Sequence, residues 1–217
     1  MPRTPSASIE RSRRIAAPTL VLAALCTMPC ARAGGGYLGI DHQWTYDDSG
    51  IWKRQYQTWL INGMIAGEIA GALWEGGEDR AGRTLWQSVD STLIGAAAEI
   101  SLKYVFSRER PDQTSDPNTW FSGHGQSFPS GEVTVTAAIV APLVFEYGKD
   151  HPAAYALELI PLYDAIARMK VRGHWASDVI AGYALGTTVG YFMHGRGSPL
   201  VLSVMPHAIQ IGLKKSF

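Results

Sequence analysis

The chain has 217 residues, of which 46% are hydrophobic and 18% are charged, and its formal net charge is zero. This composition excludes a disordered chain, and the length suits one domain with a sizeable core. A mean hydropathy of -0.02 is low for a chain made mostly of membrane spans, because spans need long apolar stretches with few charges.

The first 33 residues have the order of a secretory signal peptide. A basic stretch through Arg14 precedes an apolar run over residues 15–28, and Ala31-Arg32-Ala33 has the small-x-small form of a cleavage site. The run is short for a membrane anchor. We therefore expect cleavage after Ala33, export to the periplasm, and a single domain over residues 34–217.

The expected mature chain is acidic and free of thiols. Without the leader it has 14 basic and 18 acidic side chains, a net charge of −4. That balance argues against nucleic acid as a partner, since such binding normally needs a basic surface. Both cysteines, Cys26 and Cys30, lie in the leader, so neither a disulfide nor a cysteine metal site is expected.

Hydrophobic periodicity predicts an all-α bundle of about five helices. The expected helices cover residues 56–74, 84–106, 130–147, 153–170 and 176–193, with a kink at Pro161. Residues 111–128 are predicted to form a loop, and short strands are expected near residues 37–40 and 209–213. The apolar stretches 133–145 and 179–192 are shorter than a span, which favours a periplasmic domain and leaves contact with a membrane surface open.

Three separated segments combine basic or small polar residues with turn residues. They are residues 103–111, 128–132 and 168–178. Where a loop enters a helix, as at Ser130 and Gly131, main-chain N–H groups and the helix dipole favour a phosphate. Arginine guanidinium groups and a lysine ammonium group from the other two segments can donate hydrogen bonds to the remaining phosphate oxygens. They can also stabilise the negative charge of a transition state. The candidate phosphate ligands are Lys103, Arg110, Ser130, Gly131 and Arg168.

His174 and Asp178 stand four residues apart at the start of the last predicted helix. This spacing places them on one face, so the carboxylate is expected to orient the imidazole and leave its other nitrogen free to attack phosphorus. A phosphohistidine intermediate follows, and this chemistry requires neither a metal nor a cofactor.

Together the three segments resemble the signature of the type 2 phosphatidic acid phosphatase and vanadium haloperoxidase superfamily. That signature is K-x6-R-P, then P-S-G-H, then S-R-x5-H-x3-D. The matching positions are Lys103, Arg110 and Pro111, then Pro129, Ser130 and Gly131, then Arg168, His174 and Asp178. The resemblance implies a helical bundle, five phosphate ligands at the positions named above, His174 as nucleophile and Asp178 as its orienting partner. It also implies action on lipid phosphates, polyprenyl diphosphates or small phosphate esters.

Two positions depart from the signature. Ala167 replaces a serine, and Glu132 replaces the histidine that the superfamily uses as general acid for the leaving group. Glu132 would be the acid if burial keeps its carboxyl protonated. His124, in the preceding loop, is the second candidate. The third possibility is a leaving group that needs no proton, such as a phosphate, or a site that only binds phosphate.

The sequence therefore predicts a metal-independent phosphatase or phosphotransferase acting on a phosphate ester or diphosphate, including lipid phosphates. Two alternatives remain open: a phosphate or lipid-headgroup binding protein with weak catalysis, and a vanadate-dependent haloperoxidase. The missing histidine and the short chain weigh against the haloperoxidase. The sequence does not indicate the substrate, the phosphate acceptor or the oligomeric state.

Overall fold

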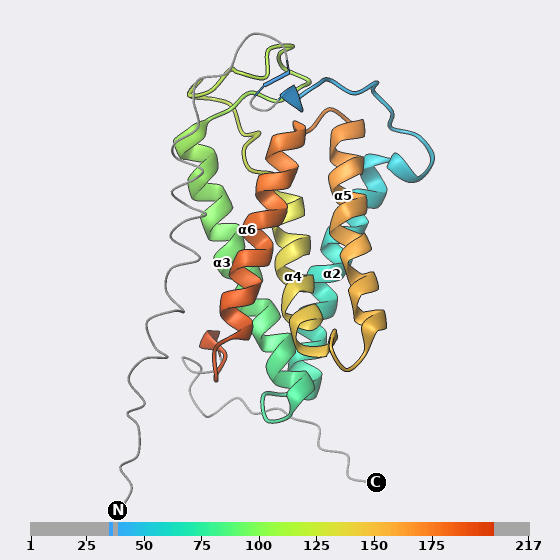
Figure 1. Ribbon diagram of the computed structural model, residues 1–217, viewed down its shortest axis with the longest axis vertical. Coiled ribbons are helices and arrows are strands. Elements are labelled where there is room, and N and C mark those ends of the chain that lie inside the picture. Colours follow the sequence, from blue (N-terminus) through green and yellow to red (C-terminus); the bar gives the residue numbers. More distant parts are fainter. Residues whose placement is uncertain (1–34, 37–38, 202–217) are drawn as a thin grey trace, which may run out of the picture. The chain divides into compact units, whose positions relative to one another are not determined.

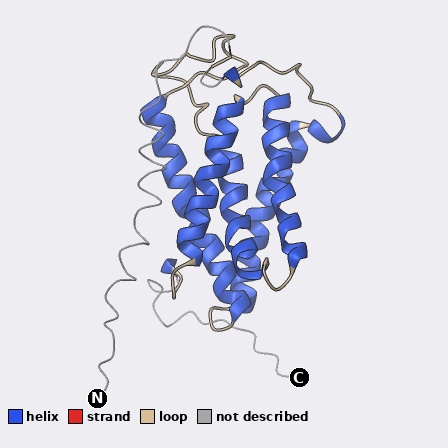
Figure 2. Ribbon diagram, viewed as in Figure 1, coloured by secondary structure: helices blue, strands red, loops and turns tan. Residues whose placement is uncertain are grey.

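Antiparallel helices make up most of the computed structural model, which describes residues 35–36 and 39–201 (Figure 1). The α-helices are α2 (Arg54–Glu75), α3 (Arg80–Phe106), α4 (Gly131–Tyr147), α5 (Leu159–Lys170) and α6 (Ala176–His194). Two 3-10 helices, η2 (Gly50–Trp52) and η3 (Pro152–Glu158), precede α2 and α5. Figure 2 shows only helices and loops among the described residues, so the predicted all-α fold is confirmed. The predicted leader, the 209–213 strand, and residues 37 and 38 of the other predicted strand lie outside the described residues.

Most helix ends fall where the sequence places a cap or a breaker. Asp79 caps α3 by accepting a hydrogen bond from the Gly82 N–H at 2.7 Å, and α2 ends before Gly76, which adopts φ 74°. The prediction of one helix over residues 153–170 is wrong, because the segment divides into η3 and α5. Pro161 does not kink α5. It lies in the first turn, where a main-chain N–H has no acceptor within the helix, so the N–H that proline lacks is not needed there.

Helix α4 occupies the middle of the bundle. It packs most extensively against α6 and α3 and also contacts α2 and α5 (Figure 1). A helix with neighbours on several sides needs apolar or hydroxyl side chains all round, and α4 has them. Its fully buried members include Val133, Thr134, Ala138, Val140 and Ala141.

A row of glycines on α6 lets this helix lie directly against α4. A Cβ atom added at Gly186 would lie 2.2 Å from the Thr134 carbonyl oxygen, and one at Gly182 would lie 2.6 Å from the Ser130 carbonyl oxygen. Any larger residue would push the helices apart at these points. The contact fixes the beginning of α4 beside the beginning of α6, where the Ser130 N–H donates to the Asp178 carbonyl oxygen at 3.0 Å.

The three motif segments meet because the helices alternate in direction. The ends of α3 and α5 and the beginnings of α4 and α6 lie at the same end of the bundle, beneath the loop of residues 107–130 (Figure 1). None of the described helices combines the length and the apolar character needed to cross a bilayer.

Candidate active site

His174 is a buried, neutral imidazole with a defined hydrogen-bond partner. It is 4% exposed and lies two residues before α6, with Nδ1 2.7 Å from the Ser127 carbonyl oxygen. Since a carbonyl only accepts, Nδ1 carries the proton and Nε2 keeps its lone pair. Burial holds the pKa of His174 well below 6.5, and the charges of Arg168, Arg110 and Lys103 lower it further. The nucleophilic form of the ring is therefore present at neutral pH.

The expected direct hydrogen bond between Asp178 and His174 is replaced by a relay through Ser127. Asp178 Oδ2 lies 4.0 Å from His174 Nδ1 and accepts from the Ser127 hydroxyl at 2.5 Å and from the Trp175 N–H at 2.9 Å. Its Oδ1 accepts from Arg108 Nη1 at 2.5 Å. Asp178 thus fixes Ser127, and the main chain of Ser127 fixes the imidazole.

Three predicted phosphate ligands act on the imidazole through their positive charge. The charges of Lys103, Arg110 and Arg168 each lower the pKa of His174. Lys103 Nζ is held by Glu99 Oε2 at 2.6 Å and by the Pro129 carbonyl oxygen at 2.5 Å. Burial lowers the pKa of this lysine, while Glu99 opposes the shift. The charges of three cations, from the two motif segments 103–111 and 168–178, therefore act on one imidazole.

Besides the carboxylate oxygens of Asp164, two buried side-chain atoms at this end of the bundle lack hydrogen-bond partners within the described part of the chain. They are Arg168 Nε and Ser130 Oγ. Leaving a buried donor unpaired costs about 1–3 kcal/mol, more when it is charged. Arg168 is packed closely, since a Cβ at Gly173 would lie 2.4 Å from its Nη2. Unpaired buried donors of this kind are what an oxyanion site requires.

The N-terminus of α4 supplies main-chain donors beginning at Gly131. The Ser130 N–H is already bonded to Asp178, so the donors without intrahelical acceptors are those of the first turn that follows. A Cβ at Gly131 would lie 2.8 Å from Glu99 Oε1. The Glu99 carboxylate therefore packs directly against this glycine, and any side chain at residue 131 would collide with it.

The comparison with known families agrees with this geometry. The model of the PAP2 superfamily matches residues 84–197, more than half of the chain, and includes all three motif segments. The chain belongs to the PAP2 superfamily. The resemblance deduced from the spacing of the motifs is thereby confirmed.

The curated relatives within the PAP2 superfamily are lipid A 1-phosphatases. The protein from Porphyromonas gingivalis is 35% identical over 89 residues, which cover 41% of this chain and 18% of that protein. Those from Rhizobium etli and Rhizobium johnstonii are 36% and 35% identical over 91 residues, which cover 39% of this chain and 38% and 36% of the respective relatives. The chain therefore matches less than half of the length of these relatives. No solved structure matches the chain significantly.

Glu132, which replaces the PAP2 histidine, is part of an ion pair that the sequence did not indicate. Both of its carboxylate oxygens accept hydrogen bonds from Arg54 of α2, one at 2.6 Å, and its Oε1 lies 3.9 Å from Arg168 Nη1. His124, the second candidate acid, has a side chain that is 73% exposed and lies 3.2 Å from Glu109. Among the contacts of the described residues, none joins His124 to His174 or Arg168.

Arg108 is a buried site residue that sequence reasoning missed. It is 1% exposed, binds Asp178, pairs with Asp41 at 2.8 Å, and stacks on the Trp120 ring at 4.3 Å. A second arginine two positions before Arg110 was the available signal. No sequence signal marked Asp41, because its partners lie far along the chain. Asp41 also accepts a hydrogen bond at 2.8 Å from the Ser177 N–H, in the first turn of α6.

A second missed group links α2 to Arg168. Gln57 Oε1 accepts from Arg54 Nη1 at 3.2 Å and from Arg168 Nη1 at 3.3 Å. Asp164, one turn before Arg168, is 1% exposed, and neither of its carboxylate oxygens has a hydrogen-bond partner among the described residues. Burial, and then the charge of Glu132, raise the pKa of Asp164 to about 7.

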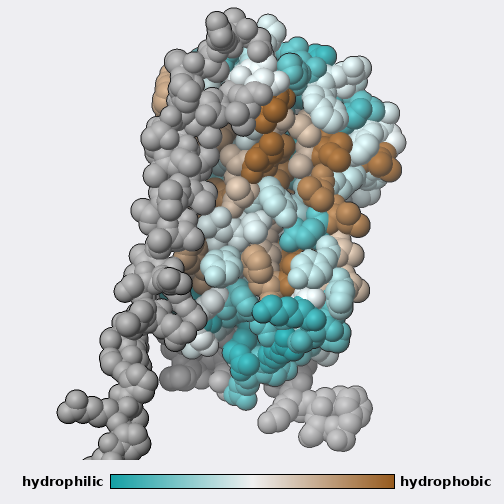
Figure 3. All heavy atoms as spheres, in the orientation of Figure 1, coloured by the Kyte–Doolittle hydropathy of each residue, from teal (hydrophilic) through white to brown (hydrophobic). Residues whose placement is uncertain are grey.

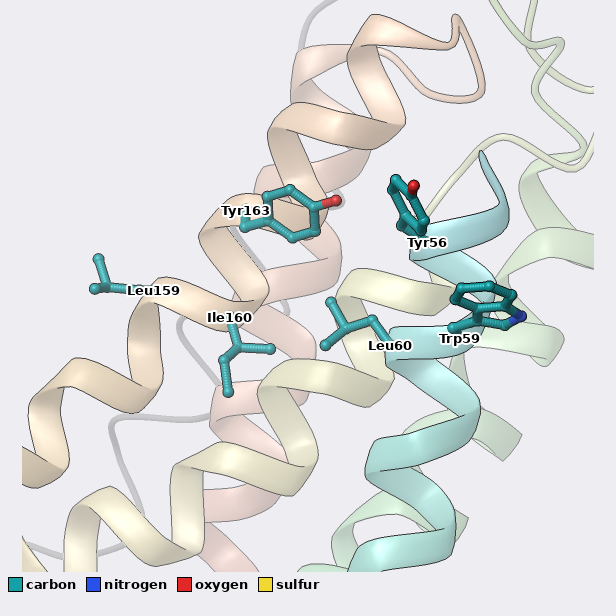
Figure 4. Close-up of a pocket in the computed structure, with 6 residues that line it drawn as sticks. All are labelled: Tyr56, Trp59, Leu60, Leu159, Ile160 and Tyr163. Carbon is teal, nitrogen blue, oxygen red and sulfur yellow. The ribbon is translucent and has the colours of Figure 1, made fainter. Parts of the chain in front are cut away.

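An apolar groove of about 520 Å³ lies between α2 and α5 (Figure 4). Its lining residues are Tyr56, Trp59 and Leu60 on α2, and Leu159, Ile160 and Tyr163 on α5. Tyr56 and Tyr163 stand in the same helical turns as Arg54 and Asp164, so this end of the groove lies at the level of the charged cluster. Apolar walls next to a charged end suit an amphiphilic molecule.

Proposed function

We propose that this protein is a phosphatase or phosphotransferase that transfers a phosphoryl group through His174, with an amphiphilic phosphate such as a lipid phosphate as substrate. One observation carries the proposal. His174 is neutral, its Nδ1 proton is bound by the Ser127 carbonyl oxygen, and the positive charges of Lys103, Arg110 and Arg168 act on its ring. Such an arrangement combines a nucleophile with the positive charge that a phosphate oxyanion needs.

The proposed reaction has two steps. In the first, Nε2 of His174 bonds to phosphorus, and the bond from phosphorus to the leaving oxygen breaks with its electron pair on that oxygen. Ser127 and Asp178 stabilise the cationic phosphohistidine through Nδ1–H. In the second step, water or another acceptor bonds to phosphorus, the P–N bond breaks, its electron pair returns to Nε2, and the acceptor's proton leaves with the phosphate.

The surface of the protein supports a lipid substrate. Figure 3 shows hydrophobic side chains gathered over the site-proximal parts of α5 and α6, and many large apolar side chains are exposed. They include Trp59, Trp74, Tyr104, Leu159, Leu162, Ile166 and Ile180. Exposed apolar patches of this kind mark contact with a membrane or a partner. We therefore propose action at the surface of a membrane, outside the cytoplasm as the leader predicts.

A phosphate-release screen with the mature protein tests this proposal. The substrates are a lipid A preparation, a phosphatidic acid in mixed micelles and a soluble aryl phosphate, all without added metal. We expect release from at least one substrate and a loss of at least about 1000-fold in His174→Ala. Arg80→Ala, which removes a partly exposed ion pair with Glu146 elsewhere on the bundle, is the matched control and should behave as wild type.

The alternative of a phosphate-binding protein with weak catalysis has one observation in its favour, the ion pair of Glu132 with Arg54. Binding of inorganic phosphate without release from any substrate would support that alternative. Release that persists in His174→Ala would contradict the proposed mechanism.

A further inference from the structure

The position that the PAP2 superfamily fills with histidine here binds a cation instead of offering a proton. Both Glu132 oxygens accept hydrogen bonds from the forked guanidinium of Arg54. Because both oxygens already accept from Arg54, neither is directed to donate a proton to a leaving group. Glu132 is thus an anchor for Arg54.

Arg54 belongs to the same cluster of charges as the phosphate ligand Arg168. The two guanidiniums share the Oε1 atom of Gln57, at 3.2 and 3.3 Å, and both lie near Glu132. Gln57 is fully buried, and its amide is oriented by the Trp52 carbonyl oxygen at 2.8 Å. Arg168 is 6% exposed and Arg54 is 42% exposed, so Arg54 is the member of the pair that remains open to solvent and to an incoming substrate.

The charges of this cluster do not cancel below neutral pH. Arg54 and Arg168 are both positive, Glu132 supplies one negative charge, and burial raises the pKa of Asp164 to about 7. While Asp164 is protonated, one positive charge is unbalanced. The cluster can therefore accept a second anion beside the phosphate held at His174.

A guanidinium and an imidazolium differ in what they offer a leaving group. An arginine side chain stays charged in proteins, so it donates hydrogen bonds without giving up a proton. It stabilises a leaving oxygen that is a stable anion, such as that of a phosphate. It does little for an alkoxide, which needs the proton itself.

We propose that Arg54 binds the leaving group, and that the site acts on diphosphates in preference to phosphate monoesters of alcohols. This rests on the proposed function. When Nε2 of His174 bonds to the terminal phosphorus, the bond from that phosphorus to the bridging oxygen breaks. Its electron pair stays on the bridging oxygen, which leaves as a phosphate anion bound by Arg54. No proton is transferred in this step.

The test compares a monophosphate and a diphosphate of the same prenyl alcohol in the same micelles. We expect kcat/KM for the diphosphate to exceed that for the monophosphate by at least about 100-fold. Arg54→Ala should lower kcat for the diphosphate roughly 100-fold, as expected for loss of one electrostatic donor in a transition state, and lower the monophosphate rate much less. Arg80→Ala is the control for loss of an ion-paired arginine. Arg54→Lys keeps the positive charge but removes the paired N–H donors of the guanidinium group.

The variant Glu132→His supplies a second, independent readout. It introduces an acid where the superfamily has one, so the preference for the diphosphate should shrink by at least tenfold. Equal rates on the two substrates in the wild type would overturn the inference while leaving the proposed function intact. A loss of turnover in Glu132→Gln that affects only the monophosphate would also overturn the inference, because it would identify Glu132 as the general acid for the leaving group. Absence of release from either substrate, or release that survives His174→Ala, would refute the proposed function itself.

Discussion

The carbonyl oxygen of Ser127 lies 2.7 Å from Nδ1 of His174, while the hydroxyl of the same serine donates to Asp178. One residue therefore connects the carboxylate to the imidazole with both its main chain and its side chain. Ser127 is fully buried in the loop that leads to α4, so the orientation of His174 depends on the path of that loop.

Replacing Ser127 by alanine should separate these two connections. The carbonyl still accepts from His174, but the link to Asp178 is lost. We expect kcat to fall by up to about 100-fold with little change in KM, because a small misplacement of a nucleophile costs rate more than binding. Ser122→Ala is the matched control, since that hydroxyl donates to the Ser107 carbonyl oxygen in the same loop. Equal losses in the two variants would assign the effect to loop stability.

The pH profile should show a nucleophile that stays neutral far into the acid range. Burial and three neighbouring cations hold the pKa of His174 well below 6.5, so the free base is present at pH 6. In the Asp164→Asn variant, which removes the titration of Asp164 near pH 7, we expect kcat/KM, corrected for titration of the substrate, to stay level from pH 7.5 to about pH 6. An NMR titration of the His174 ring in the free enzyme checks the assignment. An inflection near 6.5 in both measurements would contradict it.

The helices and the motif segments could be predicted from the sequence because they depend on local features. Gly76 and Ser130 mark helix ends directly, and the spacing of the motifs needs no knowledge of packing. The start of α3 was predicted at residue 84, whereas the helix begins at Arg80, because Asp79 was not interpreted as its N-cap. The break before α5 was misplaced because Pro161 was interpreted as a kink, whereas prolines are also favoured in a first turn.

The partners of the motif residues could not be predicted in this way. Arg54 meets Glu132, and Asp41 meets Arg108, only because α2 and the N-terminal loop are packed against distant segments. No residue spacing marks such pairs. Similarly, the direct bond expected between Asp178 and His174 depended on helical spacing alone, whereas His174 lies before the helix begins.

Asp164 should make stability depend on pH in a window set by its two pKa values. Its pKa is about 7 in the folded protein against an ordinary value of 3.8 for an exposed aspartate, so the folded state holds the proton more tightly. The free energy of unfolding of the wild type, relative to Asp164→Asn, should therefore fall as pH rises from about 4 to about 8. The limit of this change is about 4 kcal/mol. Urea unfolding at several pH values measures it, with the exposed Asp150→Asn as control; parallel curves for wild type and Asp164→Asn would refute it.

The groove between α2 and α5 should matter for amphiphilic substrates. Trp59 is 60% exposed in its wall, so Trp59→Glu places a charge where an apolar chain would lie. We expect kcat/KM for a micellar lipid phosphate to fall at least tenfold more than that for a soluble aryl phosphate. Trp74→Glu is the matched control, because Trp74 is 72% exposed at the opposite end of the same helix. Equal effects of the two variants would indicate general contact with micelles instead of a groove.

Trapping the covalent intermediate tests the central claim most directly. Mature protein is mixed with a radiolabelled substrate, quenched in alkali within milliseconds and digested, and the labelled peptide is sequenced by mass spectrometry. The proposed mechanism predicts an acid-labile phosphate on His174 that forms and decays at rates matching turnover. Full turnover without a phosphorylated residue, or with the phosphate on any other side chain, would contradict it.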